Sequence, residues 1–259
     1  GKNKRLLASI LAASMLLAMS PFALAEGTED TTVQEQSQST EGGGSSESAP
    51  GSMQLLPAAP GEETGAEENA LTAVPAEMLL FDKGVIKGID ADWLAKNKDK
   101  RLSVAIPAEM GGTPVTSIGQ NAFRAKYAGL KNHPQVAAVD FSNATNLEKI
   151  DNQAFQYSPV TSVDLSNTKV TTIGKFAFGG CTSLETFIFP DTLTSLGNSD
   201  GASVFTDCRS LKVMRLAGSP EGVVFALPET LKHIGNNTFK NCFADGVDAK
   251  IIIPASVAT

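Results

Sequence analysis

Three cysteines are the residues of this sequence whose type and spacing most suggest chemistry. Cys181, Cys208 and Cys242 each follow a phenylalanine by three residues, which places them at one repeated position. Equivalent residues of stacked strands lie about 4.8 Å apart, and parallel side chains keep their Cβ atoms at that spacing, beyond the roughly 3.5 to 4.5 Å of a disulfide. We therefore expect three buried free thiols rather than the disulfide that is common in exported proteins. No histidine or second cysteine stands at ligand spacing, so we expect no metal site and no cofactor.

Histidines and carboxylates give little indication of catalysis. His133 falls in a variable stretch and His233 at a variable position, where solvated side chains are the simplest interpretation. Asp140 and Asp164 recur within the repeated segment Val-Asp-(Phe/Leu)-Ser-Asn, so we expect solvated strand carboxylates rather than an acid pair for hydrolysis. The sequence contains no phosphate-binding glycine loop, zinc-protease helix or nucleophile elbow. We expect a protein that is not an enzyme.

These residues are positioned by an internal repeat. Five segments share an apolar residue, two variable residues, Ile or Leu, usually Gly, and a stretch that ends in Phe. A short strand with alternating apolar residues precedes each segment, and Ile251–Ile253 is expected to open a sixth. The shortest spacing between the phenylalanines is 23 residues, and the longer spacings of 32, 27 and 34 indicate insertions at 124–134, 198–203 and 218–225. The repeated phenylalanines are Phe123, Phe155, Phe178, Phe205 and Phe239.

The phase of the repeat predicts which side chains are buried. The phenylalanines and the apolar residues of the repeated segments and of the strands that precede them are expected to point into one continuous core. The glycine that follows Ile or Leu, as in Gly119 and Gly174, is expected to make a tight turn with positive φ. Asp151 stands where the other segments carry this glycine.

The segment Phe176-Ala-Phe178-Gly-Gly-Cys181-Thr-Ser-Leu184-Glu-Thr-Phe187-Ile-Phe189-Pro190 resembles the BspA-like leucine-rich repeats of bacterial surface proteins. The resemblance covers residues 102–259, with the last repeat incomplete. It implies a leucine-rich-repeat solenoid, a right-handed stack of short parallel strands joined by turns or short helices. It also implies a role at the cell surface in adhesion or recognition.

The first 101 residues have a different composition. Residues 1–25 combine basic residues, an apolar run and a small-residue cleavage pattern, which predicts a secretory signal peptide cleaved after Ala25. An uncleaved anchor is the alternative, but the run is shorter than the roughly 20 residues of a spanning helix. Residues 26–80 are rich in Gly, Ser and Glu and predict a disordered acidic tether. Residues 81–101 predict an N-terminal cap with a short helix that begins at Asp90 and contains Trp93, which is expected to cover the core.

Charge excludes several classes of partner. Between residues 26 and 80 the sequence has eleven acidic and no basic residues, whereas the rest of the chain after Leu80 has 17 acidic and 18 basic ones. The formal charge of -7 therefore arises largely in the tether. The sequence has no stripe of basic residues of the kind that binds nucleic acid or anionic lipid.

Candidate binding residues lie on two surfaces. Extended faces of solenoids are their usual binding surfaces, and loops held by a rigid scaffold are the second candidate. A solvated sheet surface is the alternative for each residue individually, and Ile188, Val213 and Ile252 are the exception because they predict an exposed apolar patch. The strand-face candidates are Asp140, Asp164, Thr186, Ile188, Val213, Arg215 and Ile252, and the loop candidates are Arg124, Lys126, Tyr127 and His133.

The sequence thus predicts a secreted or cell-surface module that binds an extracellular protein or glycan, including one of host origin. The alternatives are a structural spacer that displays another domain and an accessory repeat region of a larger surface enzyme. Nothing in Ala255–Thr259 looks like a polar cap, so we also expect either further repeats or self-association through an uncapped C-terminal end.

Overall fold

The computed structural model describes residues 70–125, 133–197, 202–220 and 222–258. These residues belong to one of two compact units, Pro60–Thr259. The predicted signal peptide, most of the predicted tether, and the candidates Lys126 and Tyr127 lie outside the described residues. No helix within the described part of the chain is long and apolar enough to cross a membrane.

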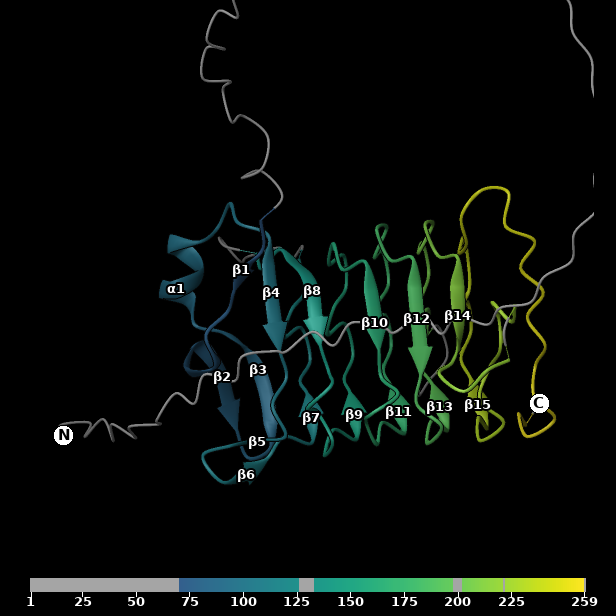
Figure 1. The fold of residues 1–259 in the computed structure, drawn as a ribbon, viewed down its shortest axis with the longest axis horizontal. Coiled ribbons are helices and arrows are strands. Elements are labelled where there is room, and N and C mark those ends of the chain that lie inside the picture. The colour runs from purple at the N-terminus through teal and green to yellow at the C-terminus, as the bar shows by residue number, and fades with distance from the viewer. Residues whose placement is uncertain (1–69, 126–132, 198–201, 221, 259) are drawn as a thin grey trace, which may run out of the picture. The chain divides into compact units, whose positions relative to one another are not determined.

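Short parallel strands along one side of the stack form the strand face, as the alternating apolar segments predict (Figure 1). Two three-stranded sheets make up this face, in the orders β1-β4-β8 and β10-β12-β14. Within each sheet the neighbouring strands are parallel, and their register is regular except for a shift between Leu102 and Ser103 of β4. The strands are β1 (Thr72–Ala73), β4 (Leu102–Ala105), β8 (Val136–Asp140), β10 (Ser162–Asp164), β12 (Thr186–Phe189) and β14 (Val213–Leu216).

A second side carries a seven-stranded sheet in the order β15-β13-β11-β9-β7-β3-β2. Its two-residue strands come from the Ile-Gly, Ile-Asp or Leu-Gly segments of the repeat, and only the terminal β2-β3 hairpin is antiparallel. A small antiparallel hairpin of β5 and β6 lies outside this sheet. The strands are β2 (Leu79–Asp82), β3 (Val85–Ile89), β5 (Glu109–Met110), β6 (Thr113–Pro114), β7 (Ser117–Ile118), β9 (Lys149–Ile150), β11 (Thr172–Ile173), β13 (Ser195–Leu196) and β15 (His233–Ile234).

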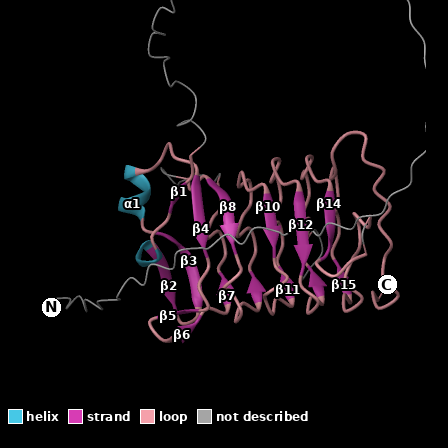
Figure 2. Cartoon of the chain, viewed as in Figure 1, coloured by secondary structure: helices cyan, strands magenta, loops and turns pink. Residues whose placement is uncertain are grey.

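The third side consists of turns rather than helices (Figure 2). Successive coils are joined there by backbone hydrogen bonds, such as Phe155 N to Ala177 O at 2.8 Å and Phe178 N to Val204 O at 3.0 Å. Residues two before or two after the repeated phenylalanine adopt positive φ, as Gln153 does at 61°. The left-handed conformation turns the chain sharply at these positions. Within the described residues 102–258 no helix connects the strands.

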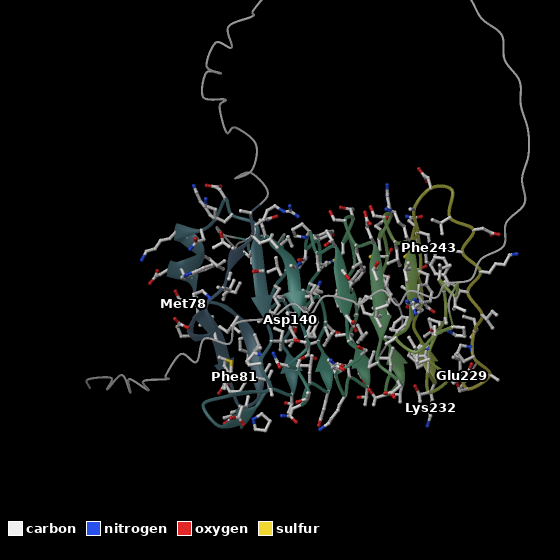
Figure 3. All side chains as sticks on the ribbon, viewed as in Figure 1. Met78, Phe81, Asp140, Glu229, Lys232 and Phe243 are labelled. Atoms are coloured by element: carbon white, nitrogen blue, oxygen red, sulfur yellow. The ribbon has the colours of Figure 1, made fainter. Side chains whose placement is uncertain are left out.

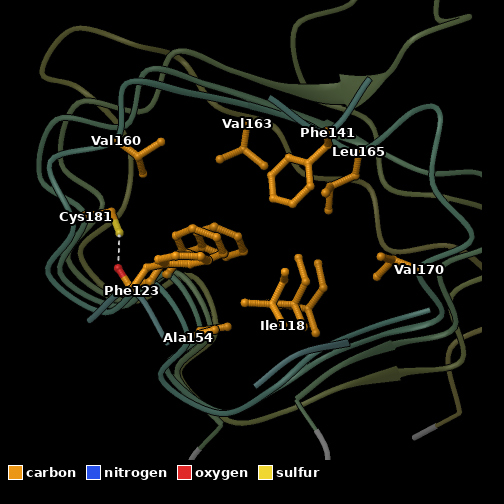
Figure 4. Packing of buried hydrophobic residues seen from close by; sticks show 14 of the residues in the cluster. Ile118, Phe123, Phe141, Ala154, Val160, Val163, Leu165, Val170 and Cys181 are labelled. Atoms are coloured by element: carbon orange, nitrogen blue, oxygen red, sulfur yellow. Dashed lines mark hydrogen bonds between the residues drawn. The ribbon is translucent and has the colours of Figure 1, made fainter. Parts of the chain in front are cut away.

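The phenylalanine column forms the centre of the core, as predicted (Figure 4). Phe155, Phe178 and Phe205 are fully buried. The rings of Phe155 and Phe178 stack at 5.2 Å with 3° between their planes, and those of Phe178 and Phe205 stack at 5.8 Å and 11°. Phe239 continues the column at 6.0 Å from Phe205 but is only partly buried.

The N-terminal cap contains the predicted helix but begins earlier than predicted. Helix α1 (Ala91–Lys96) starts at Asp90, whose Oδ1 accepts hydrogen bonds from the backbone N–H groups of Asp92 and Trp93. Trp93 packs against the core and is partly buried. However, β1, the 3-10 turn Ala76–Met78 and the start of β2 fall in residues 70–80, which the sequence assigned to the tether.

The reason for this difference is a few apolar residues at the end of a polar stretch. Val74 and Leu79 are buried in the core, and β1 pairs with β4 through Thr72 and Leu102. Composition averaged over a long window does not detect so short an ordered segment.

The repeated glycines correct a second expectation. Only Gly197 has the expected positive φ, at 77°, and Gly119 and Gly174 do not. Their role is close approach between coils, because a Cβ on Gly174 would lie 2.6 Å from Asn152 N. Asp151 is tolerated at this position. It accepts a hydrogen bond from Ser117 and forms an ion pair with Lys149.

The expected sixth strand is also wrong. Residues 251–253 form no strand. Instead, part of the insertion at 218–225 lies beside β14, where Met214 N donates to Val224 O and Ala226 N donates to Met214 O, at 2.7 and 2.8 Å. The insertion therefore occupies the position next to β14 that the sixth strand was expected to take.

Candidate binding surface

The strand face presents a row of outward side chains in fixed register. Asp164, Ile188 and Arg215 occupy equivalent positions on β10, β12 and β14, and Ala105 is paired with Asp140 on β4 and β8. Along the stack, the side chain at this position is thus first small, then acidic, then apolar and finally basic. Asp140 appears near the middle of the molecule in Figure 3.

The acidic part of the row lies at the ends of β8 and β10, where each carboxylate bonds to the turn that follows its strand. Asp140 Oδ1 accepts a hydrogen bond from Ser142 N at 2.8 Å, and Asp164 Oδ1 accepts one from Ser166 N at 2.9 Å. Both carboxylates are exposed. Both residues line a hollow of about 130 Å³, and their exposure agrees with the solvated strand carboxylates that the sequence predicts.

The predicted apolar patch does not exist. Ile188 is only 9% exposed, and Val213 is partly buried. Ile252 is 81% exposed but lies in a segment without strand structure, because the insertion takes the place beside β14. Thr186 is in register with Val213, and its side chain is partly buried.

A concavity at the C-terminal part of the strand face brings β14 together with the insertion. It has a volume of about 460 Å³ and is bounded by Val213 and Arg215 on one side and by described residues of the following segment on the other, namely Ala217, Ser219, Pro220, Gly222, Val223 and Val224. Arg215 is partly buried there, and its Nη1 donates to Leu216 O at 3.3 Å. The sequence identified Arg215 as a candidate but did not predict the wall beside it.

Of the loop candidates, the structure describes Arg124 and His133, which are both partly buried. Arg124 Nη1 donates to Asn121 Oδ1 at 3.4 Å, and its guanidinium lies 5.9 Å from the centre of the Tyr157 ring. Tyr157 is 41% exposed and is a surface residue that the sequence analysis missed. Its position two residues after a repeated phenylalanine could have identified it.

The cysteines are free, as predicted, but only Cys181 and Cys208 are buried, whereas Cys242 is partly buried. Cys181 Sγ donates to Phe155 O at 3.1 Å (Figure 4), and Cys208 Sγ donates to Phe178 O at 3.2 Å, so each of these two thiols bonds to the preceding coil. Burial raises the pKa of Cys181 and of Cys208 far above the ordinary range, and it raises the pKa of Cys242 to about 12. Neutral, buried thiols are poor nucleophiles, and their arrangement here is structural.

Among the residues that the structure describes, no group of three or more His, Cys, Asp or Glu side chains is arranged to hold a metal ion. The strand face presents acidic, apolar and basic side chains at its outward positions.

A family profile described as "BspA type leucine rich repeat region" matches residues 108–244 in six copies. The sequence analysis recognised five full segments, and the sixth that it placed at Ile251 lies beyond the matched region. No curated protein matches the chain.

Solved structures of bacterial leucine-rich repeat proteins are similar to the chain. A protein from Bacteroides ovatus is 26% identical over 60% of this chain and 28% of its own, with a TM-score of 0.33. The T. pallidum leucine-rich repeat protein is 20% identical over 66% of this chain and 68% of its own, with a TM-score of 0.30. A leucine-rich cell surface protein from Faecalibacterium prausnitzii is 22% identical over 66% and 52%, with a TM-score of 0.27. The chain thus spans about a quarter of the Bacteroides ovatus protein.

Proposed function

The chain belongs to the family of BspA-type leucine-rich repeat proteins, and from this premise we propose that it is a secreted or cell-surface module that binds an extracellular protein or glycan through its strand face. The proposed location rests on the signal peptide that residues 1–25 predict. We infer a binding role rather than a catalytic one, because the carboxylates of the strand face are solvated and the thiols pack between the coils.

The observation that carries this proposal is the contrast between constant interior and variable exterior on the same strands. Inward positions repeat large apolar side chains, such as Val163 and Phe187, whereas the neighbouring outward positions carry Asp164, Ile188 and Arg215. Register fixes the spacing of these outward groups. A rigid surface with chemically different groups at fixed spacing is what selective binding requires.

The test uses the whole chain and a panel of extracellular-matrix proteins and mucins. Ser162 is exposed and points outward on β10, so Ser162→Trp should block the strand face and weaken binding at least tenfold. Thr171 is exposed beside β11 on the other sheet, and Thr171→Trp is the matched control that should bind normally.

Equal weakening by both variants, or none by Ser162→Trp, would contradict binding through the strand face. If no member of the panel binds the wild-type chain, a spacer that holds another domain away from the cell becomes the better interpretation.

A further inference from the structure

The concavity beside β14 differs from the rest of the strand face because it has a wall. The wall comes from the insertion, which turns away after β14 and returns as residues 224–226 to bond with Met214. Pro220, Val223 and Val224 line it, and Val213 and Arg215 line the facing side. A ligand group placed here would contact protein on more than one side, which an open sheet does not provide.

Arg215 is the charged group among the described residues that line this concavity. Four other cations of the described residues, Lys149, Arg209, Lys212 and Lys250, form ion pairs with acidic residues. No carboxylate of the described part of the chain lies within ion-pair distance of Arg215, and its printed hydrogen bond goes to a neutral carbonyl, Leu216 O, at 3.3 Å. A guanidinium has five N–H donors in a planar fork that fits the two oxygens of a carboxylate.

We propose, building on the proposed function, that this concavity binds an acidic side chain of an extended peptide segment, with its carboxylate on Arg215. The aliphatic lining favours a peptide over a glycan. Val213, Val223, Val224 and Pro220 would bury an aliphatic neighbour of the acidic residue. Pyranose rings bind mainly by stacking on aromatic side chains, and none of the lining residues is aromatic.

The register of the sheet sets the spacing between the charged residues of the peptide. Arg215 lies two strands from Asp164, which is about 10 Å at the usual spacing of neighbouring strands. A peptide in the polyproline II conformation rises about 3.1 Å per residue and has three residues per turn, so a basic residue three positions from the acidic one lies on the same face of the peptide and reaches Asp164. The ligand class is therefore an extended peptide with a basic residue, an aliphatic stretch and an acidic residue in that spacing.

The experiment titrates the whole chain with the capped peptide Gly-Lys-Leu-Val-Glu-Val-Gly and follows backbone amides by NMR. Shifts are expected at Val213, Arg215, Val223 and Val224. Replacing the peptide's Glu by Gln should weaken binding about tenfold, as expected for loss of a charge-assisted pair. Arg215→Gln should weaken binding of the Glu peptide by a similar factor and leave the Gln peptide unaffected. This dependence of the Arg215→Gln effect on the peptide's Glu distinguishes a direct contact between the two side chains from a purely structural role of Arg215.

Arg209→Gln is the matched control, because Arg209 is exposed and pairs with Asp207 elsewhere on the surface. It should leave binding of the Glu peptide unchanged.

The inference is overturned if the Glu and Gln peptides bind equally, if Arg209→Gln weakens binding as much as Arg215→Gln, or if millimolar Glu peptide causes no shifts. Oligogalacturonate that binds the concavity more tightly than the peptide would also overturn it in favour of an acidic glycan. These outcomes leave the proposed function intact as long as Ser162→Trp abolishes binding to an extracellular component and Thr171→Trp does not.

Discussion

The interior column of the solenoid and the outer row of its strand face are made by the same coils, yet they follow opposite rules. In the column, Phe155, Phe178 and Phe205 repeat one side chain with nearly parallel rings. In the row, equivalent positions carry Asp164, Ile188 and Arg215. Stacking requires each coil to match its neighbours inside, whereas the outside has no such constraint. The difference predicts that stability depends on the column and recognition on the row.

The largest expected effect is loss of a ring from the middle of the column. Phe178 is fully buried between Phe155 and Phe205, so Phe178→Ala should lower the free energy of unfolding by about 3 to 5 kcal/mol. Phe239 is only partly buried, and Phe239→Ala should cost about 1 to 2 kcal/mol. Urea denaturation measures both. Equal losses would contradict the idea that a ring needs a neighbouring coil on each side.

A smaller loss is expected from a methyl group between two coils. Gly174→Ala would place a Cβ 2.6 Å from Asn152 N and 2.8 Å from the carbonyl carbon of Asp151, and the resulting backbone shift should cost about 1 to 3 kcal/mol. Gly218→Ala is the control, because a Cβ there meets nothing within 4 Å. If thermal melting shows Gly174→Ala to be neutral, the coils are less closely stacked than described.

The buried thiols predict a loss of stability at alkaline pH. Their pKa values are raised in the folded protein, mainly by burial, so the folded state holds protons that the unfolded state releases. The stabilisation is complete below about pH 8.5, the pKa of an unfolded thiol, and is lost as the pH rises, by about 1.4 kcal/mol per pH unit for each thiol.

Urea denaturation at pH 7.5 and 9.5 measures this loss. The Cys181→Ala variant should lose less stability between the two values than the wild-type chain does. After denaturation without reductant, thiol titration should give three equivalents, and recovery of a single thiol would reveal a disulfide instead.

The smallest effect is expected on the outer face. Thr186 lies on β12 and its side chain is only partly buried, so Thr186→Ala should change the free energy of unfolding by less than about 0.5 kcal/mol. A loss comparable with that of Phe178→Ala would mean that the inward and outward positions of β12 are exchanged.

The sequence predicted the repeated packing of the core and missed contacts that occur only once. The phenylalanine column and the free thiols were predicted correctly, because every coil repeats the same position. The ordered segment before residue 81 and the return of the insertion beside β14 were missed, because each depends on a single contact, such as that of Met214 with Val224. The burial of Ile188 was missed because alternation predicts direction but not coverage by neighbouring side chains.

Backbone conformation was also beyond the sequence pattern. Positive φ was expected at glycines, but Gln153, Tyr157 and Phe176 adopt it on the turn side of the coils. Stacking hydrogen bonds such as Tyr157 N to Gly179 O hold this conformation in place, and the sequence gives no local signal for it. Of the candidate binding residues, the sequence correctly placed Asp164 and Arg215 on the strand face, but the concavity around Arg215 depends on the insertion.

The most direct test of this division between column and row is cross-saturation NMR on the chain in complex with an extracellular component that binds it. Attenuated amide signals are expected at the outward residues of β10, β12 and β14, including Ser162, Thr186 and Arg215. Signals of β9, β11 and β13 on the other sheet should keep their intensity. Attenuation centred on β9, β11 and β13 would contradict the account, because recognition would then lie on the side opposite the row.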